Sequence, residues 1–241
     1  MRISLIIPMY NESSIIADTA RTIDSYMREH FEDYEVIFFD DGSVDNSAEI
    51  VTSLALPRIR VSGYGGNRGK GAAIRHAMLE ADGDVIMFTD ADLAYGTYVI
   101  GHVYDVFKNA PDTDMLIGSR NIHKDGYEGY TVLRKMMSKA YIKVLCFMGR
   151  FKLTDSQCGC KAFSSKAAKD IFSRCEVDGF AFDFEAILWA QTLGYKIREM
   201  PVKVINHRES KVRLLKDTLK MLSDLRRIKK SVKKRAKTDN M

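Results

Sequence analysis

The stretch that decides the fold is GDVIMFTDAD, residues 83–92, in which an apolar run leads into two aspartates. The run GDVIMF is typical of a buried strand that emerges from a turn. Alternate side chains of an extended chain share a face, so Asp90 and Asp92 are expected to point the same way. Two like charges this close repel each other unless a positive charge lies between them. The stretch therefore predicts a strand that ends at a site for a cation.

Strands and helices are predicted to alternate along the first two-thirds of the chain. Strands are expected over residues 2–8, 34–41, 58–63, 84–92 and 113–120. Helices are expected over residues 15–27, 45–55 and 69–81, with Ser13 or Ser14 as the N-cap of the first. Strands that alternate with helices of about 10–15 residues indicate βαβ units. The predicted fold class is therefore α/β, with a mostly parallel central sheet flanked by helices.

Polar residues follow three of the predicted strands, over residues 8–12, 40–43 and 90–92. In open α/β sheets, ligands bind beyond the carboxyl ends of the strands. We therefore expect one site built from all three segments.

The glycine-rich stretch GYGGNRGKGAA, residues 63–73, does not form a phosphate-binding P-loop motif. Tyr64 stands where that motif has its first glycine, and Gly71 replaces the Ser or Thr that would hold Mg²⁺. Two interpretations stay open. The stretch is a flexible turn before a helix, or Asn67, Gly69 and Lys70 line a wall that faces phosphate or base.

Composition indicates a globular protein of 241 residues without a membrane-spanning segment, because no stretch reaches the roughly 18 uncharged apolar residues required. No secretory signal is expected either. The four cysteines suggest a reducing compartment. Cys158 and Cys160 are interpreted as small buried thiols in preference to a metal or redox pair.

The net charge of +5 is unevenly distributed. Residues 211–237 contain 12 Lys or Arg against two Asp, while the rest of the chain has 25 basic and 30 acidic residues. Residues 1–210 are predicted to form the main domain, and residues 211–241 a basic amphipathic helix and a flexible tail. The anionic partner of this tail is expected to be a membrane surface and not a nucleic acid, because no aromatic residue follows Tyr195 to stack on bases.

Two amphipathic stretches concern the membrane. From Leu133 to Met148, apolar residues recur at helical spacing among Lys and Arg residues. From Leu215 to Val232, leucines lie on one side of a helix and Lys and Arg on the other. Such helices bind anionic bilayer surfaces. The alternative for both is that the apolar side packs against the core.

Seven motifs together resemble a known family. IIPMYNE, FFDDGSVDNS, NRGKGAAIRHAM, DADLA, IGSR, DSQCGCKAF and FDFEAILWA occur in the order found in family 2 glycosyltransferases with the GT-A fold. The resemblance covers nearly all of residues 3–211. Within the family, the chain most resembles dolichyl- or polyprenyl-phosphate glucose synthases, followed by dolichyl-phosphate mannose synthases.

The resemblance implies roles for matching residues. It places Pro8, Tyr10, Glu12, Asp40 and Asp41 around the base and ribose of a nucleotide sugar, and it places Asp90, Ala91, Asp92 and Lys211 along its diphosphate. Lys70, from the glycine-rich stretch, is expected to join these donor-binding residues. Asp90 and Asp92 are implied as ligands of Mg²⁺ or Mn²⁺. The resemblance implies catalytic roles for Asp92, Asp155 and Arg120, and Arg134 is added to this set as a further cation expected near the site.

The implied reaction is the inverting transfer of a hexose to a polyprenyl or dolichyl phosphate, with glucose from UDP-glucose favoured, by a peripheral enzyme at the cytoplasmic membrane face. GDP-mannose as donor, a saccharide hydroxyl as acceptor and a nucleotide-sugar binding protein without turnover are the alternatives.

The chemistry of the implied reaction favours a divalent cation at Asp90 and Asp92, and it reduces the need for a general base that deprotonates the acceptor. Mg²⁺ and Mn²⁺ prefer oxygen ligands, commonly one or two carboxylates plus phosphates and water. The alternative is that Asp90 caps the next helix and Asp92 is solvated. A phosphate monoester has a second pKa of about 6 and is already nucleophilic at neutral pH, so cations such as Arg120, Arg134, Lys161 and Lys211 are expected to matter more than Asp155 as a base.

Overall fold

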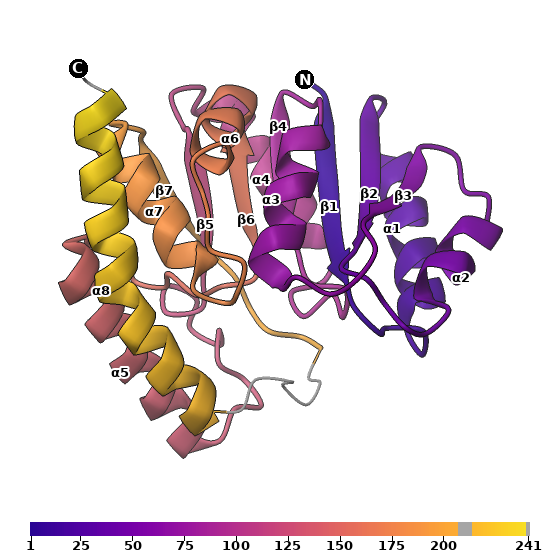
Figure 1. The fold of residues 1–241 in the computed structure, drawn as a ribbon. Coiled ribbons are helices and arrows are strands. Elements are labelled where there is room, and N and C mark those ends of the chain that lie inside the picture. Colours follow the sequence, from indigo (N-terminus) through magenta and orange to yellow (C-terminus); the bar gives the residue numbers. More distant parts are fainter. Residues whose placement is uncertain (207–213, 240–241) are drawn as a thin grey trace.

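The computed structural model describes residues 1–206 and 214–239, and it places one seven-stranded sheet between two layers of helices (Figure 1). The strands are β1 Ile3–Met9, β2 Tyr34–Asp40, β3 Ile59–Gly63, β4 Val85–Phe88, β5 Met115–Ser119, β6 Lys161–Ser164 and β7 Ile197–Pro201. The helices are α1 Ile16–His30, α2 Ser47–Ser53, α3 Lys70–Glu80, α4 Tyr98–Asn109, α5 Val132–Gly149, α6 Ser165–Phe172, α7 Phe182–Thr192 and α8 Leu214–Asp239.

The sheet has the strand order β3-β2-β1-β4-β6-β5-β7. β6 is antiparallel to β4 and β5, and the other neighbouring strands are parallel. The predicted α/β fold with a mostly parallel sheet is thereby confirmed. Because β6 runs against β4, the residues that precede β6 lie at the carboxyl edge of β4, where the strand-end acids are.

Alternation along the strands divides the core between the two faces of the sheet. In β1, Ile3, Leu5 and Ile7 pack with α1 and α4, whereas Ile6 packs on the opposite face with α3, α6 and α7. All four side chains are buried. A strand covered on both faces reads as a continuous apolar run, which is why β1 and β2 could be predicted from the sequence.

The predicted N-cap of the first helix is wrong. α1 begins at Ile16, and its N-cap is Ile15, which makes no side-chain capping hydrogen bond. Ser13 N instead donates to Asp45 Oδ2 at 3.1 Å, and Glu12 N donates to Ser47 Oγ at 2.9 Å. The loops after β1 and β2 are therefore held by each other and not by a local cap.

Near the end of the chain, where a basic amphipathic helix and a tail were predicted, the structure describes the helix α8. α8 continues to Asp239, and its Leu225, Ile228 and Val232 are buried in the core with α7. Lys229 Nζ donates to Met148 O at 2.6 Å, which joins α8 to α5. The two helices lie side by side at one end of the sheet (Figure 1). The apolar side of α8 is thus part of the fold, because the core of α7 would otherwise be exposed.

No helix in the described part of the chain is both long enough and apolar enough to span a bilayer.

Candidate active site

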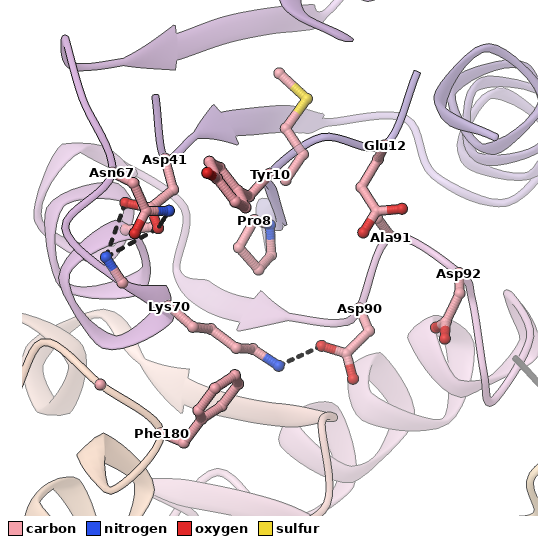
Figure 2. Close-up of a pocket in the computed structure, with 14 residues that line it drawn as sticks. Pro8, Tyr10, Glu12, Asp41, Asn67, Lys70, Asp90, Ala91, Asp92 and Phe180 are labelled. Atoms are coloured by element: carbon pink, nitrogen blue, oxygen red, sulfur yellow. Dashed lines mark hydrogen bonds and ion pairs between the residues drawn. The ribbon is translucent and has the colours of Figure 1, made fainter. Parts of the chain in front are cut away.

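The carboxyl ends of β1, β2 and β4 open into one cleft of about 470 Å³ (Figure 2). It is lined by Pro8, Met9, Tyr10, Glu12, Asp41, Asn67, Gly69, Lys70, Ala73, Asp90, Ala91, Asp92, Gly179 and Phe180. The three strand-end segments therefore meet as expected. Asp40 is not among the lining residues, and its carboxylate accepts hydrogen bonds from Ser43 N at 3.1 Å and Ser43 Oγ at 2.5 Å.

Asp90 and Asp92 lie in a turn and not in a strand. β4 ends at Phe88, and Leu93 N donates to Asp90 O at 3.0 Å while Leu93 has a φ of 47°. The extended-chain reason for their common orientation was therefore wrong, although both carboxylates line the cleft. Asp92 Oδ1 accepts a hydrogen bond from Ala94 N at 3.1 Å, which holds this carboxylate within the turn. Asp90 does not cap the next helix, because Thr97 is the N-cap of α4.

A lysine from α3 supplies positive charge beside the two acids. Lys70 Nζ forms an ion pair with Asp90 Oδ1, as Figure 2 shows. Burial by itself would lower the pKa of Lys70, but the charge and hydrogen bond of Asp90 and the charges of Asp183 and Asp92 together outweigh this effect, and the pKa is raised. Burial and the neighbouring charge of Asp90 raise the pKa of Asp92. Lys70 therefore offsets only part of the negative charge in this corner of the cleft.

The donor set at this corner fits a divalent cation. Mg²⁺ is commonly held by one or two carboxylates, with phosphates and water completing its shell. Asp90 and Asp92 would supply the carboxylates, and the cation would stabilise the ionised form of Asp92, which burial and the charge of Asp90 disfavour. Within residues 1–206 and 214–239, no group of three or more His, Cys, Asp or Glu is arranged to hold a metal, so phosphate and water would complete the shell.

Asp41 anchors the glycine-rich loop. Its buried carboxylate accepts hydrogen bonds from Tyr64 Oη at 2.7 Å, Asn67 Nδ2 at 2.8 Å and Gly69 N at 2.9 Å. Burial and the hydrogen bond to Asp41 raise the pKa of Tyr64, so this phenol stays protonated and donates. Asn67, Gly69 and Lys70 line the cleft, which favours the interpretation of this stretch as a wall over that of a flexible turn.

The start of α3 is not a phosphate cradle. Gly71 N and Ala72 N both donate to Asp178 O, at 2.8 and 3.2 Å. Gly69 has a φ of 107°, and an added Cβ would lie 2.5 Å from Asp178 O, so a glycine is required there. Because the loop around Asp178 occupies these amides, the side chain of Lys70 is what α3 contributes to the cleft.

Arg120 and Asp155 form a buried pair near the end of β5, the same edge of the sheet. Arg120 Nε and Nη2 donate to Asp155 Oδ2 and Oδ1 at 2.6 and 3.0 Å. Both residues are buried. Asp155 is thus engaged through both oxygens and orients Arg120, an arrangement that leaves it poorly placed to take a proton from an acceptor. Neither residue lines the cleft.

Lys161 is placed differently from the expectation that it faces the phosphates. Its ammonium group is fully buried, forms an ion pair with Asp183 Oδ1 at 2.7 Å and donates to Cys158 O at 2.6 Å. Burial raises the pKa of Asp183, and the charge of Lys161 opposes that shift. This pair therefore belongs to the core beneath the site.

Sequence reasoning missed Gly159 and Tyr95. A Cβ at Gly159 would overlap Asp90 Oδ2, and Gly159 N donates to Tyr95 Oη at 3.3 Å. The signal was present in the segment DSQCGCKAF, but only the antiparallel course of β6 brings Gly159 to Asp90. Burial raises the pKa of the flanking thiols, for Cys158 to about 11, so both stay protonated, as buried thiols do.

Two expected site residues cannot be placed. Lys211 lies outside the described residues, and Arg134 belongs to α5 but its side chain is also outside the described part.

Comparison with known proteins identifies the family. The family model described as glycosyl transferase family 2 matches residues 4–172, from the second residue of β1 to the end of α6, and these residues include most of the cleft lining. The chain belongs to glycosyl transferase family 2. The predicted family is therefore confirmed, and the cleft is the candidate active site of a family 2 glycosyltransferase.

Similar curated proteins extend beyond that match. A dolichyl-phosphate beta-glucosyltransferase of Trichomonas vaginalis is 31% identical over 234 residues, covering 92% of this family 2 glycosyltransferase and 69% of the relative. A human dolichyl-phosphate beta-glucosyltransferase is 28% identical over 241 residues, covering 93% of this chain and 74% of the relative.

Solved structures show the same fold. Glucosyl-3-phosphoglycerate synthase of Mycobacterium tuberculosis, in complex with Mn²⁺, UDP and glucosyl-3-phosphoglycerate, has a TM-score of 0.68 at 17% identity, covering 92% of this chain and 79% of that chain. Mannosyl-3-phosphoglycerate synthase of Rubrobacter xylanophilus has a TM-score of 0.67 at 17% identity, covering 100% of this chain and 75% of that chain. These likenesses confirm the GT-A fold of this family 2 glycosyltransferase.

Proposed function

We propose that this glycosyltransferase transfers a hexose, with glucose from UDP-glucose as the favoured donor, to a dolichyl or other polyprenyl phosphate. The similarity to proteins named dolichyl-phosphate beta-glucosyltransferases supports the sugar and the acceptor. A solved structure of the same fold contains UDP and Mn²⁺, which supports the nucleotide and the metal.

The observation that carries the proposal is the corner formed by Lys70, Asp90 and Asp92. Two carboxylates and one ammonium group face a cleft that Pro8 and Tyr10 line further along. In this proposal the nucleoside occupies the Pro8 and Tyr10 end of the cleft, and the diphosphate lies beside Lys70 and the two acids. Asp90 and Asp92 would hold Mg²⁺ or Mn²⁺, which neutralises charge on a departing diphosphate when bound.

The transfer needs no side chain to remove a proton. An oxygen of the acceptor phosphate attacks C1 of the sugar from the face opposite the nucleoside diphosphate. The new C1–O bond forms as the old C1–O bond to the diphosphate breaks, so the configuration at C1 inverts. Because the acceptor is mainly a dianion at neutral pH, the protein has to position two anionic groups and reduce their repulsion.

Arg120 is the described cation best suited to the acceptor side. Asp155 holds its guanidinium through two hydrogen bonds, and Tyr127 lies against it with the ring centroid 5.3 Å from Arg120 Cζ. A guanidinium fixed in this way is oriented before the acceptor arrives, which lowers the entropic cost of binding.

The lipid acceptor places the reaction at a membrane surface. We propose that the enzyme associates peripherally with the cytoplasmic face through its basic helices α5 and α8. Lys135, Lys139 and Lys143 are exposed on α5, and Lys230, Lys233 and Lys234 are exposed on α8. Anionic lipids attract such lysines.

The direct test is a transfer assay with purified full-length chain, radiolabelled nucleotide sugar, Mn²⁺ and vesicles that contain polyprenyl phosphate. We expect a glucosyl lipid from UDP-glucose and little product from GDP-mannose. Product from GDP-mannose alone would change the donor, and product only with a saccharide alcohol would change the acceptor. Binding of nucleotide sugar without any product would show a binding protein and refute the proposal.

A further inference from the structure

α5 presents an apolar stripe to solvent that the core does not use. Val132, Leu133, Met136, Val144 and Phe147 have exposed fractions of 76%, 67%, 64%, 40% and 85%. The last four, together with Ala140, are spaced by three or four residues and so share one face of the helix. The other side of α5 packs inward through Tyr141, Leu145 and Met148. The apolar residues predicted to form one amphipathic pattern thus lie on two faces of α5, one that packs against the core and one that is exposed to solvent.

We propose that this exposed stripe, Leu133 to Phe147, inserts into the outer part of an anionic lipid monolayer and lays α5 flat on the membrane. The inference rests on the proposed function and adds the face by which the enzyme meets its lipid acceptor. α5 has 18 residues, or about 27 Å at 1.5 Å per residue. Its length alone would nearly span a bilayer, but no described helix is long and apolar enough to cross one, so α5 is expected to lie along the surface.

The positive charge beside the stripe indicates that anionic lipid, and not a protein partner, covers it. Lys135, Lys139 and Lys143 are exposed along one flank of the stripe. Lysines in this position extend their ammonium groups to headgroups while neighbouring apolar side chains enter the acyl region. A second copy of the chain would bring the same row of lysines against its equivalent, which like-charge repulsion opposes. The apolar residues described on α8 are unavailable, because Leu225, Ile228 and Val232 are buried in the core.

The lysine flank leads toward the site. Lys135 Nζ and Lys139 Nζ lie 5.6 and 5.9 Å from the centroid of the Tyr127 ring, which also contacts Arg120. A monolayer seated on α5 therefore has its headgroups beside the segment that connects to Arg120. A phosphate carried by a lipid in that monolayer reaches the enzyme from this side.

The depth to which the α5 stripe inserts into a bilayer tests the proposal directly. We would place a reporter on the stripe as Phe147→Trp and use Val44→Trp as the matched control, because Val44 is exposed to 87% but lies in the loop before α2. The native Trp189 is buried, and its constant emission is measured on the unmodified chain and subtracted. With vesicles of phosphatidylglycerol and phosphatidylcholine, we expect the emission of the Phe147→Trp variant to shift to the blue and to be quenched by brominated acyl chains. The emission of the Val44→Trp variant should do neither.

Binding gives the second measure. The double variant Leu133→Gln, Phe147→Gln should lower the vesicle partition coefficient about tenfold or more, since partitioning scales with the inserted apolar area. The control Val44→Gln, Leu79→Gln should leave the coefficient unchanged. High salt should weaken binding of the unmodified chain without abolishing it, because salt screens the lysines and not the apolar contact.

Three results would overturn the inference. The first is that the full-length chain does not bind these vesicles. The second is that it binds them while the fluorescence of the tryptophan at residue 147 stays unquenched. The third is that the double variant loses self-association in sedimentation but keeps its vesicle binding. These measurements use neither donor nor turnover, so a failure of the transfer assay would leave them unaffected and would refute the proposed function alone.

Discussion

Asp90 and Asp92 have different surroundings although one residue separates them. Asp90 is paired with Lys70, whereas the pKa of Asp92 is raised by burial and by the charge of Asp90. A raised pKa of an acid means that the folded protein disfavours its ionised form. A cation bound beside Asp92 would therefore stabilise the ionised carboxylate that the folded protein otherwise disfavours.

Replacing that charge is expected to abolish transfer without unfolding the protein. Asp92→Asn should lower the transfer rate by about 100-fold or more, because the cation loses a ligand and the departing diphosphate keeps more of its charge. At neutral pH the melting temperature without metal should stay the same or rise, since the disfavoured carboxylate is gone. Calorimetry with and without Mn²⁺ would check this, with the exposed Asp18→Asn on α1 as control. Transfer near the unmodified rate would remove the metal from the mechanism.

Gly159 provides a second test at the scale of single atoms. Gly159→Ala should displace the Asp90 carboxylate, because the added methyl group would overlap Asp90 Oδ2. We expect the rate to fall about 100-fold, the cost typical of a catalytic group moved by about 1 Å, and the Mn²⁺ requirement to shift to higher concentration. Gly65→Ala is the matched control, since its Cβ meets nothing within 4 Å. Equal effects of the two substitutions would show that this close approach is unimportant.

At the scale of elements, the loops after β1 and β2 are held together by Asp45. Its carboxylate accepts hydrogen bonds from Ser13 N at 3.1 Å and from Ser47 N and Oγ at 3.1 and 2.5 Å. Slight burial would raise the pKa of Asp45, but these hydrogen bonds outweigh it and lower the pKa from 3.8 to about 2. The folded protein therefore binds this proton less readily than the unfolded chain.

The sign of this shift sets a pH dependence. The stabilisation is fully present above pH about 4 and is lost as the pH falls toward about 2. Asp45→Ala should lower the free energy of unfolding at pH 7 by about 1 kcal/mol, and the difference should shrink between pH 4 and 2.5. Urea denaturation at several pH values measures it. A difference that grows as the pH falls would contradict the assignment.

α8 is the second element whose place in the fold can be tested. Arg235 Nη2 donates to Glu185 Oε1 at 3.2 Å, and its Cζ lies 5.1 Å from the Trp189 ring centroid, so α8 is attached to α7 by charge as well as by apolar contact. Ile228→Ala should therefore cost about 2–4 kcal/mol of unfolding free energy, as for other buried large-to-small substitutions. The exposed Lys230→Ala should cost less than about 0.5 kcal/mol. If denaturation shows no difference between them, α8 is a peripheral appendage.

At the scale of the whole molecule, donor binding and folding are coupled through the cleft, because its walls come from segments between Pro8 and Phe180. A ligand that binds only the folded state raises its stability, by about 2.7 kcal/mol at 100 times its dissociation constant. We expect UDP-glucose with Mn²⁺ to raise the melting temperature more than GDP-mannose or dTDP-glucose, and more than UDP-glucose without metal. Equal shifts for all donors would argue against recognition of the base and would weaken the assignment of UDP-glucose.

A feature of the fold or of the site could be predicted when the interactions that form it join residues close together in the sequence. The strands β1 and β2 and the helix α3 could be predicted because apolar periodicity follows from backbone geometry within a few residues. The convergence of the polar strand ends followed from the rule for open α/β sheets. The N-cap of α1 could not, because Asp45 and Ser47 satisfy that loop from 30 or more residues away.

By itself, the sequence determined the α/β architecture, the edge of the sheet that carries the site, and the presence of the acids and of Lys70 at that edge. Only the tertiary structure decided that Asp155 holds Arg120, that Lys161 is buried with Asp183, that Gly159 lies against Asp90, and that α5 has two apolar faces with different neighbours. The physical reason is that a single sequence records which side chains share a face of an element. Which face meets the core, an ion pair or solvent is decided by strand order and by packing between residues distant along the chain.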